Sequence, residues 1–211
     1  MDRVSLKNAA KAQIKGNIGV LFVCYLIIAV ISAVCSGVTM GIASIIVVPP
    51  LSLGLIIIYL GMYNGSEARI ETLFKGFKIN FVKSILVEIL VFVFTFLWSL
   101  LFIIPGIIKA FSYSMSMYIL ADNPQMTSLE AINESKRIMH GHKMDLFVLY
   151  LSFIPWYLLV MITFGIAGIY VAPYMYMTIT NFYKSISGSA QYQGEAAETD
   201  DSSNGGAFYA E

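Results

Sequence analysis

The chain has 211 residues, of which 58% are apolar and only 12% are charged, and its mean hydropathy is +0.75. A soluble domain carries about 25% charged residues, so this composition excludes a soluble globular protein and indicates an all-α integral membrane protein. The net charge is zero, but residues 1–186 carry +5 and residues 187–211 carry −5. The basic residues are scattered between apolar tracts, which argues against a nucleic-acid-binding surface.

The first predicted element is an amphipathic helix at residues 3–15. Its lysines Lys7, Lys11 and Lys15 recur every four residues and therefore share one helical face. We expect this helix to lie on the membrane surface, with the three lysines toward anionic lipid head groups. The apolar run that follows is longer than the core of a signal peptide, which favours a retained first span.

Three long apolar blocks follow, at about residues 17–63, 84–121 and 144–183. As one helix the middle block would be about 57 Å long, against a hydrocarbon layer of about 30 Å. Each block is therefore predicted to form a hairpin of two spans. The breaks are assigned to Pro49-Pro50, to Pro105-Gly106 and to Gly165–Gly168 with Pro173. The six predicted spans are residues 18–36, 46–63, 84–104, 106–121, 144–163 and 166–184.

The positive charges predict the orientation of these spans. Lys and Arg collect in the N-terminal segment and in the two polar stretches between the blocks, whereas the breaks at 37–45 and 164–168 carry no charge. Because cytoplasmic loops are enriched in Lys and Arg, both termini and the polar stretches are predicted to be cytoplasmic. The hairpin tips are then external.

A short glycine motif introduces each block and suggests an internal repeat. The motifs are IKGN at 14–17, FKGF at 74–77 and MHGH at 139–142. Each follows a short amphipathic stretch, and in the third stretch Thr127 and Glu130 are spaced as a capping box. We therefore expect three helical hairpins around a pseudo-threefold axis, with cytoplasmic interfacial helices. The alternative is that short glycine motifs recur by chance.

Two polar stripes lie on the spans of the middle block. Lys109, Ser112 and Ser116 follow i, i+3, i+7 spacing, with Tyr113 adjacent. On the preceding span the second stripe has i, i+7, i+11 spacing and consists of Glu88, Thr95 and Ser99. If the two faces meet, a polar seam runs through the hairpin.

A charged residue inside a span is by default a functional hypothesis. The candidate ligand-binding residues are therefore Lys109, Ser112, Tyr113, Ser116 and Glu88. The alternatives are that Lys109 and Glu88 extend to opposite membrane surfaces, and that the hydroxyls bond their own helix or pack between helices.

Residues for catalysis or for a cofactor are not indicated. The sequence has no nucleophile elbow, phosphate loop or paired catalytic carboxylates, and His140 and His142 alone are weak grounds for a metal site. We expect no cofactor, no metal and no enzymatic activity. The acidic, Gly- and Ser-rich tail at 187–211 is predicted to be disordered. It is either a solvated tail or a partner-binding segment that uses Phe208 and Tyr209.

The segment FLWSLLFIIPGIIKAFSYSMSMYILADNP (96–124) closely resembles the hallmark segment of an uncharacterised bacterial membrane family, domain of unknown function 975. The segments PPLSLG (49–54), LFKGF (73–77) and GHKMDLFVLYLSFIPW (141–156) also resemble that family, so the resemblance covers roughly residues 3–186. It implies a multi-pass protein of the bacterial cytoplasmic membrane, without an assigned reaction or catalytic residue.

The family is distantly similar to membrane domains attached to glycerophosphodiester phosphodiesterases, which favours a lipid-related role. Our leading hypothesis is a non-enzymatic protein that binds or moves an amphipathic or anionic ligand, such as a lipid or a peptide. The alternatives are a structural or accessory subunit of a membrane complex and, least favoured, an intramembrane enzyme.

Overall fold

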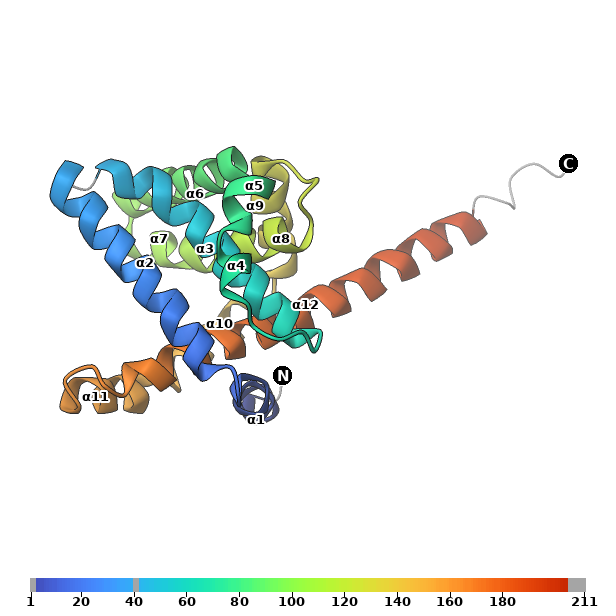
Figure 1. Cartoon of the computed structure of the whole chain (residues 1–211). Coiled ribbons are helices and arrows are strands. Elements are labelled where there is room, and N and C mark those ends of the chain that lie inside the picture. The colour runs from blue at the N-terminus through green and yellow to red at the C-terminus, as the bar shows by residue number, and fades with distance from the viewer. Residues whose placement is uncertain (1–2, 40–41, 205–211) are drawn as a thin grey trace, which may run out of the picture.

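The structure is a computed structural model that describes residues 3–39 and 42–204, and these residues form helices without any strand (Figure 1). The all-α fold is therefore confirmed. The helices are α1 (Arg3–Ile14), α2 (Ile18–Thr39), α3 (Ile42–Tyr63), α4 (Ile70–Leu73), α5 (Lys75–Ile79), α6 (Phe81–Leu101), α7 (Ile103–Tyr113), α8 (Ser116–Asp122), α9 (Ser128–Ile138), α10 (Lys143–Leu151), α11 (Ile154–Ile162) and α12 (Gly168–Asn204).

Five segments are long and apolar enough to cross a membrane, so the chain is a multi-pass membrane protein. They are Ile18–Gly37, Ala43–Tyr63, Phe81–Leu100, Ile103–Asp122 and Lys143–Ile162. Each coincides with one of the first five predicted spans. The sixth predicted span, 166–184, lies in α12 and is not among the five, since tyrosines, threonines, Asn181 and Lys184 interrupt its apolar residues.

The surface of the hairpins fits a lipid environment. Large apolar side chains stay exposed on α6, α7 and α11, and Leu100, Ile103 and Ile162 are each 75% exposed. A soluble protein rarely presents so large an apolar patch, because contact with water is unfavourable, whereas lipid chains solvate it.

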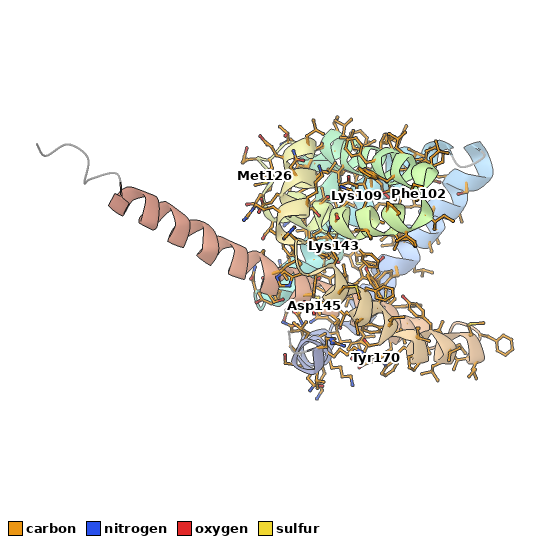
Figure 2. The ribbon with its side chains drawn as sticks, turned by 180° about the vertical axis from the view of Figure 1, so that it is seen from behind. Phe102, Lys109, Met126, Lys143, Asp145 and Tyr170 are labelled. Carbon is orange, nitrogen blue, oxygen red and sulfur yellow. The ribbon has the colours of Figure 1, made fainter. Side chains whose placement is uncertain are left out.

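The hairpin turns lie on one side of the molecule. In Figure 2, Phe102 at the α6–α7 turn and Met126 in the loop after α8 lie on opposite sides. The end of α2, the start of α3 and the α11–α12 connection lie on the side of Phe102 (Figures 1 and 2). This is the arrangement expected when several hairpins enter a membrane from the same face.

The turn between α6 and α7 differs in position from the prediction. The break was assigned to Pro105-Gly106, but α6 ends at Leu101, Phe102 is extended, and α7 already begins at Ile103. Pro105 is thus the third residue of α7. The first turn of a helix has N–H groups without an intrahelical partner, so a proline lacking its N–H is tolerated there. The proline therefore follows the break rather than forming it.

Prolines do not break the other two hairpins. Pro49 and Pro50 lie inside α3, and Pro173 lies inside α12. Membrane helices tolerate internal proline because neighbouring groups satisfy the freed carbonyls. In the first hairpin α2 ends at Thr39 and α3 begins at Ile42, both within the predicted break at 37–45. The third turns near Phe164 and Gly165, which both have positive φ, as the break at 164–168 predicted.

The predicted amphipathic helices α1 and α9 are present, but the three glycine motifs are not equivalent. The capping box of α9 is confirmed, because Thr127 and Glu130 hydrogen bond reciprocally. Gly16 and Gly141 each follow an amphipathic helix with φ of +91° and +85°. Gly76 lies inside α5 instead, where it packs on the Pro50 carbonyl. The first and third motifs share a geometry that the second lacks.

The C-terminal region begins within α12. This helix continues through Asn204 and projects away from the other helices (Figure 1). Alanine, glutamine and glutamate residues after position 189 favour helix, and the disorder of the acidic tail stays a prediction. Phe208 and Tyr209, the predicted partner-binding residues, lie outside the described residues.

Candidate functional site

Lys109 is partly buried on α7, and its ammonium faces the preceding helix α6. Its Nζ lies 4.5 Å from the centroid of the Trp98 ring, which is a cation–π distance. Within residues 3–39 and 42–204 its ammonium forms no ion pair with a carboxylate. The site therefore contains a cation within a candidate span, held by an aromatic ring rather than by an opposite charge.

Ser112, Tyr113 and Ser116 are buried below Lys109, toward α8. The Ser112 hydroxyl donates to the Ile108 carbonyl at 2.9 Å, and the Ser116 hydroxyl donates to the Tyr113 carbonyl at 2.8 Å. Both bonds stay within the local helical backbone, as one of the alternatives for these hydroxyls expected. In this arrangement the three side chains belong to the packed joint between α7 and α8.

The second polar stripe divides between two places. Gly106 of α7 packs directly on Ser99, so the two helix faces do meet near the turn. Glu88 instead lines a hollow of about 600 Å³ between α3 and α6, whose other lining residues are Ser44, Ile45, Val48, Pro49, Ile89 and Phe92. Glu88 precedes Trp98 by ten residues, or about 15 Å along α6. The structure therefore does not bring Glu88 to Lys109.

Ser135 of α9 hydrogen bonds to backbone groups at the joint between α7 and α8, a role that was not predicted from the sequence. Helix α7 ends at Tyr113 and α8 starts at Ser116, so backbone groups there lose their helical partners. The fully buried Ser135 hydroxyl donates to the Ser112 carbonyl at 2.8 Å and accepts from the Met115 N–H at 3.2 Å. Its signal in the sequence was a polar residue on the buried face of α9.

Lys7 of α1 closes a similar joint between α10 and α11. Its Nζ donates to the Ser152 carbonyl at 3.1 Å and lies 4.4 Å from the Phe153 ring centroid. Burial, reinforced by the neighbouring Lys11 ammonium, lowers the pKa of Lys7.

Lys11 also contacts the protein, because its Nζ lies 5.5 Å from the Tyr174 ring centroid. Two of the three lysines predicted at lipid head groups thus contact the protein itself, and Lys15 is exposed.

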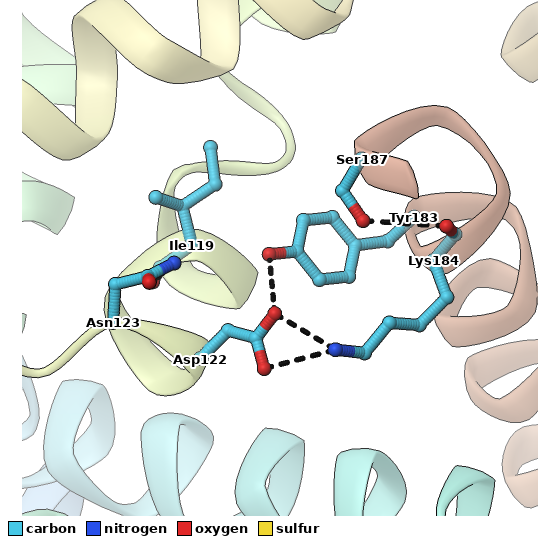
Figure 3. A network of polar contacts seen from close by, with 6 residues as sticks. All are labelled: Ile119, Asp122, Asn123, Tyr183, Lys184 and Ser187. Carbon is cyan, nitrogen blue, oxygen red and sulfur yellow. Dashed lines mark hydrogen bonds and ion pairs between the residues drawn. The ribbon is translucent and has the colours of Figure 1, made fainter. Parts of the chain in front are cut away.

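A polar network joins α8 to α12 (Figure 3). The Asp122 carboxylate accepts from the Tyr183 hydroxyl at 3.0 Å and from Lys184 Nζ at 2.8 Å. It borders a hollow of about 360 Å³ that is also lined by Glu134 and Arg137, themselves an ion pair. Because the charges around this hollow are paired with one another, we interpret the network as a structural contact that holds α12 against α8.

The histidines do not form a metal centre with their neighbours. His142 Nδ1 lies 3.2 Å from the Asp145 carboxylate, but the described residues contain no group of three or more His, Cys, Asp or Glu that could hold a metal ion.

Residues 102–190 match the model of a family described as protein of unknown function (DUF975). Comparisons with curated proteins and with solved structures found no significant match. The matched segment contains Lys109 and the α7–α8 joint, whereas PPLSLG, LFKGF and the rest of residues 3–101 lie outside it. Residues 102–190 are therefore similar to DUF975, the family that the motifs of the chain resemble.

Proposed function

We propose that this membrane protein binds an amphipathic, anionic ligand, such as a lipid or a peptide, and that Lys109 anchors the anionic group. One observation carries the proposal: the Lys109 ammonium lies in a candidate span over the Trp98 ring, without an acidic partner among the described residues. An unpaired cation is costly in a membrane, so the anionic group of a ligand supplies the charge that the protein lacks there.

The other predicted residues have different roles in this proposal. Trp98 orients the ammonium, and Ser112, Tyr113 and Ser116 stabilise the helix below it. Glu88 belongs to the separate hollow between α3 and α6 and does not contact the ligand at Lys109. The ligand site is therefore narrower than the predicted seam.

The membrane topology in this proposal has six spans in the bacterial cytoplasmic membrane, with the first part of α12 as the sixth. Both termini are cytoplasmic, because Lys and Arg collect away from the hairpin turns. A threefold repeat of hairpins also belongs to this proposal, and the common geometry of Gly16 and Gly141 supports it for two of the three motifs. Head-group contacts of the exposed Lys11 and Lys15 belong to this arrangement, whereas Lys7 is held by the Ser152 carbonyl.

The second candidate is a structural or accessory subunit. It is favoured by the length of α12, which extends beyond the packed helices and presents a separate surface for a partner (Figure 1). In that role the protein needs neither an anionic ligand nor Lys109.

Replacing Lys109 with glutamine is expected to weaken ligand binding by at least about tenfold, since a hydrogen bond to a charged group contributes about 1.5–3 kcal/mol. Trp98 and Trp156 are the two tryptophans, so Trp98 is a site-specific fluorophore in a Trp156→Phe background. Brominated phosphatidylglycerol and brominated phosphatidylcholine, each in reconstituted vesicles, are the quenchers. In the parent protein we expect Trp98 fluorescence to be quenched more strongly by brominated phosphatidylglycerol than by brominated phosphatidylcholine. In the Lys109→Gln protein we expect the two lipids to quench it equally.

Lys109→Arg keeps the positive charge and is expected to retain the preference. Lys78→Gln removes an exposed cation outside the spans and is the matched control. Equal quenching preference in the parent and Lys109→Gln proteins would exclude Lys109 as an anchor for anionic lipid.

A further inference from the structure

A second hollow, of about 450 Å³, lies at the end of α3, on a different part of the chain from Lys109. Its lining residues come from the last turns of α3, from the following loop and from α4 and α5: Ile57, Ile58, Gly61, Ser66, Glu67, Arg69, Thr72 and Lys75. The α3 residues belong to the candidate span Ala43–Tyr63, and the others follow it. One wall is thus membrane helix, and the opposite wall is polar.

The loop wall of this hollow is held by defined hydrogen bonds. Helix α3 ends in a Schellman motif, in which the Ser66 N–H donates to the Gly61 carbonyl at 2.9 Å and Gly65 has a φ of +83°. The Asn17 side-chain oxygen accepts from the Ala68 N–H at 3.2 Å. The backbone that carries Ser66 and Arg69 is therefore fixed without a ligand.

The α4–α5 wall is held by backbone contact with α3. A Cβ added to Gly54 would overlap the Leu73 carbonyl, and a Cβ added to Gly76 would overlap the Pro50 carbonyl. The two glycines thus let the segments approach more closely than side chains would allow. Thr72 and Lys75 are carried by this tightly packed segment, so their positions beside Ile57 and Ile58 are fixed as well.

The charges around the hollow are not balanced. Arg69 and Lys75 are exposed, and neither forms an ion pair within the described residues. Glu67 is the one carboxylate in the lining, and the hydroxyls of Ser66 and Thr72 add hydrogen-bond donors. Two cations and two hydroxyls above an apolar floor match a ligand with a phosphate group and an adjoining apolar chain.

We infer that this hollow binds the head group of an anionic phospholipid. Arg69 and Lys75 bind the phosphate, the Ser66 and Thr72 hydroxyls donate to its oxygens, and Ile57 and Ile58 contact the start of the acyl chains. The position at the end of a candidate span places the polar wall at the level of the head groups. The site uses no residue of the Lys109 site and does not depend on it.

The test uses full-length protein with Lys109→Gln, so that the proposed Lys109 site is absent. Soluble dihexanoyl phosphatidylglycerol is titrated by calorimetry into this protein in detergent. Adding Arg69→Gln and Lys75→Gln together is expected to weaken binding by at least about tenfold, or 1.4 kcal/mol. The matched control is Arg3→Gln with Lys78→Gln, which removes one exposed arginine and one exposed lysine outside the hollow and is expected to leave affinity within about twofold.

Inorganic phosphate distinguishes a lipid from a free anion. Because the apolar floor contributes only to lipid, we expect phosphate to bind at least about tenfold more weakly than the lipid. Phosphate binding as tight as the lipid would overturn the lipid assignment, and equal lipid binding by the Arg69→Gln, Lys75→Gln protein would overturn the site. These substitutions are on exposed side chains, so folding is not at risk. Neither result bears on Lys109.

Discussion

Replacing Gly76 with alanine is expected to separate α5 from α3 and to abolish most of the folded protein. The added Cβ would overlap the Pro50 carbonyl, and because both sides of this contact are backbone, no side-chain rotation can relieve it. Overpacking of a close contact costs about 1–3 kcal/mol and occasionally more, and this contact is at the severe end. The yield of monodisperse protein in mild detergent and its melting temperature are the measurements.

Gly54→Ala should have the same effect, since its Cβ would overlap the Leu73 carbonyl. Gly19→Ala is the matched control, because Gly19 lies in α2 with nothing within 4 Å of an added Cβ. Alanine there should leave stability unchanged or raise it by about 0.5–1 kcal/mol. Equal melting temperatures for the Gly76→Ala and Gly19→Ala proteins would contradict the close packing of α5 on α3.

The second large effect is expected for Ser135→Ala at the α7–α8 joint. The substitution leaves the Ser112 carbonyl and the Met115 N–H without the hydroxyl that pairs both of them. An unpaired buried polar group costs about 1–3 kcal/mol, so the free energy of unfolding should fall by at least that amount. Amide exchange at Met115 should accelerate by at least about fivefold, which corresponds to about 1 kcal/mol.

Asn133→Ala is the control for Ser135→Ala, because Asn133 is an exposed residue on the same helix. It changes helix propensity similarly but breaks no contact with α7 or α8. Met115 exchange that is equal in the Ser135→Ala and Asn133→Ala proteins would show that Ser135 does not support the joint.

Elements that depend on local pattern and length could be predicted from the sequence. Five spans follow from apolar length against bilayer thickness, and the capping box of α9 follows from the spacing of Thr127 and Glu130. The α6–α7 turn was predicted too far along the chain, because proline is favoured just after the start of a helix as well as at a break. The local sequence therefore predicted correctly that a turn is present, but not the residue at which it begins.

The breaks inside the fourth and fifth spans differ in their local signals. Ser114-Met115 has no glycine or proline beside it, so no local signal marks the end of a helix there, whereas Pro155 at the start of α11 is a local signal for the break at Ser152-Phe153. Their backbone groups are satisfied by Ser135 and Lys7, which come from distant parts of the chain. A break of this kind depends on tertiary contacts, and a single sequence does not contain that information.

The candidate site could be predicted only in part, because it too depends on tertiary contacts. Lys109 was identified as a charged residue within a span, but its partner Trp98 lies on the neighbouring helix, where only hairpin geometry brings the two together. Arg69 and Lys75 looked like ordinary basic loop residues that set orientation. Their shared hollow depends on Asn17 and on the close approach of α4 and α5 to α3.

The most direct test of the hairpin arrangement is single-cysteine labelling of reconstituted protein in a Cys24→Ala, Cys35→Ala background. Ile104 and Phe164 are 72% and 99% exposed at two turns, while Asn64 and Gln125 are exposed beyond α3 and α8. We predict that a membrane-impermeant maleimide labels Ile104→Cys and Phe164→Cys from one side, and Asn64→Cys and Gln125→Cys only from the other. Labelling of Ile104→Cys from the same side as Gln125→Cys would contradict the hairpin fold of the chain.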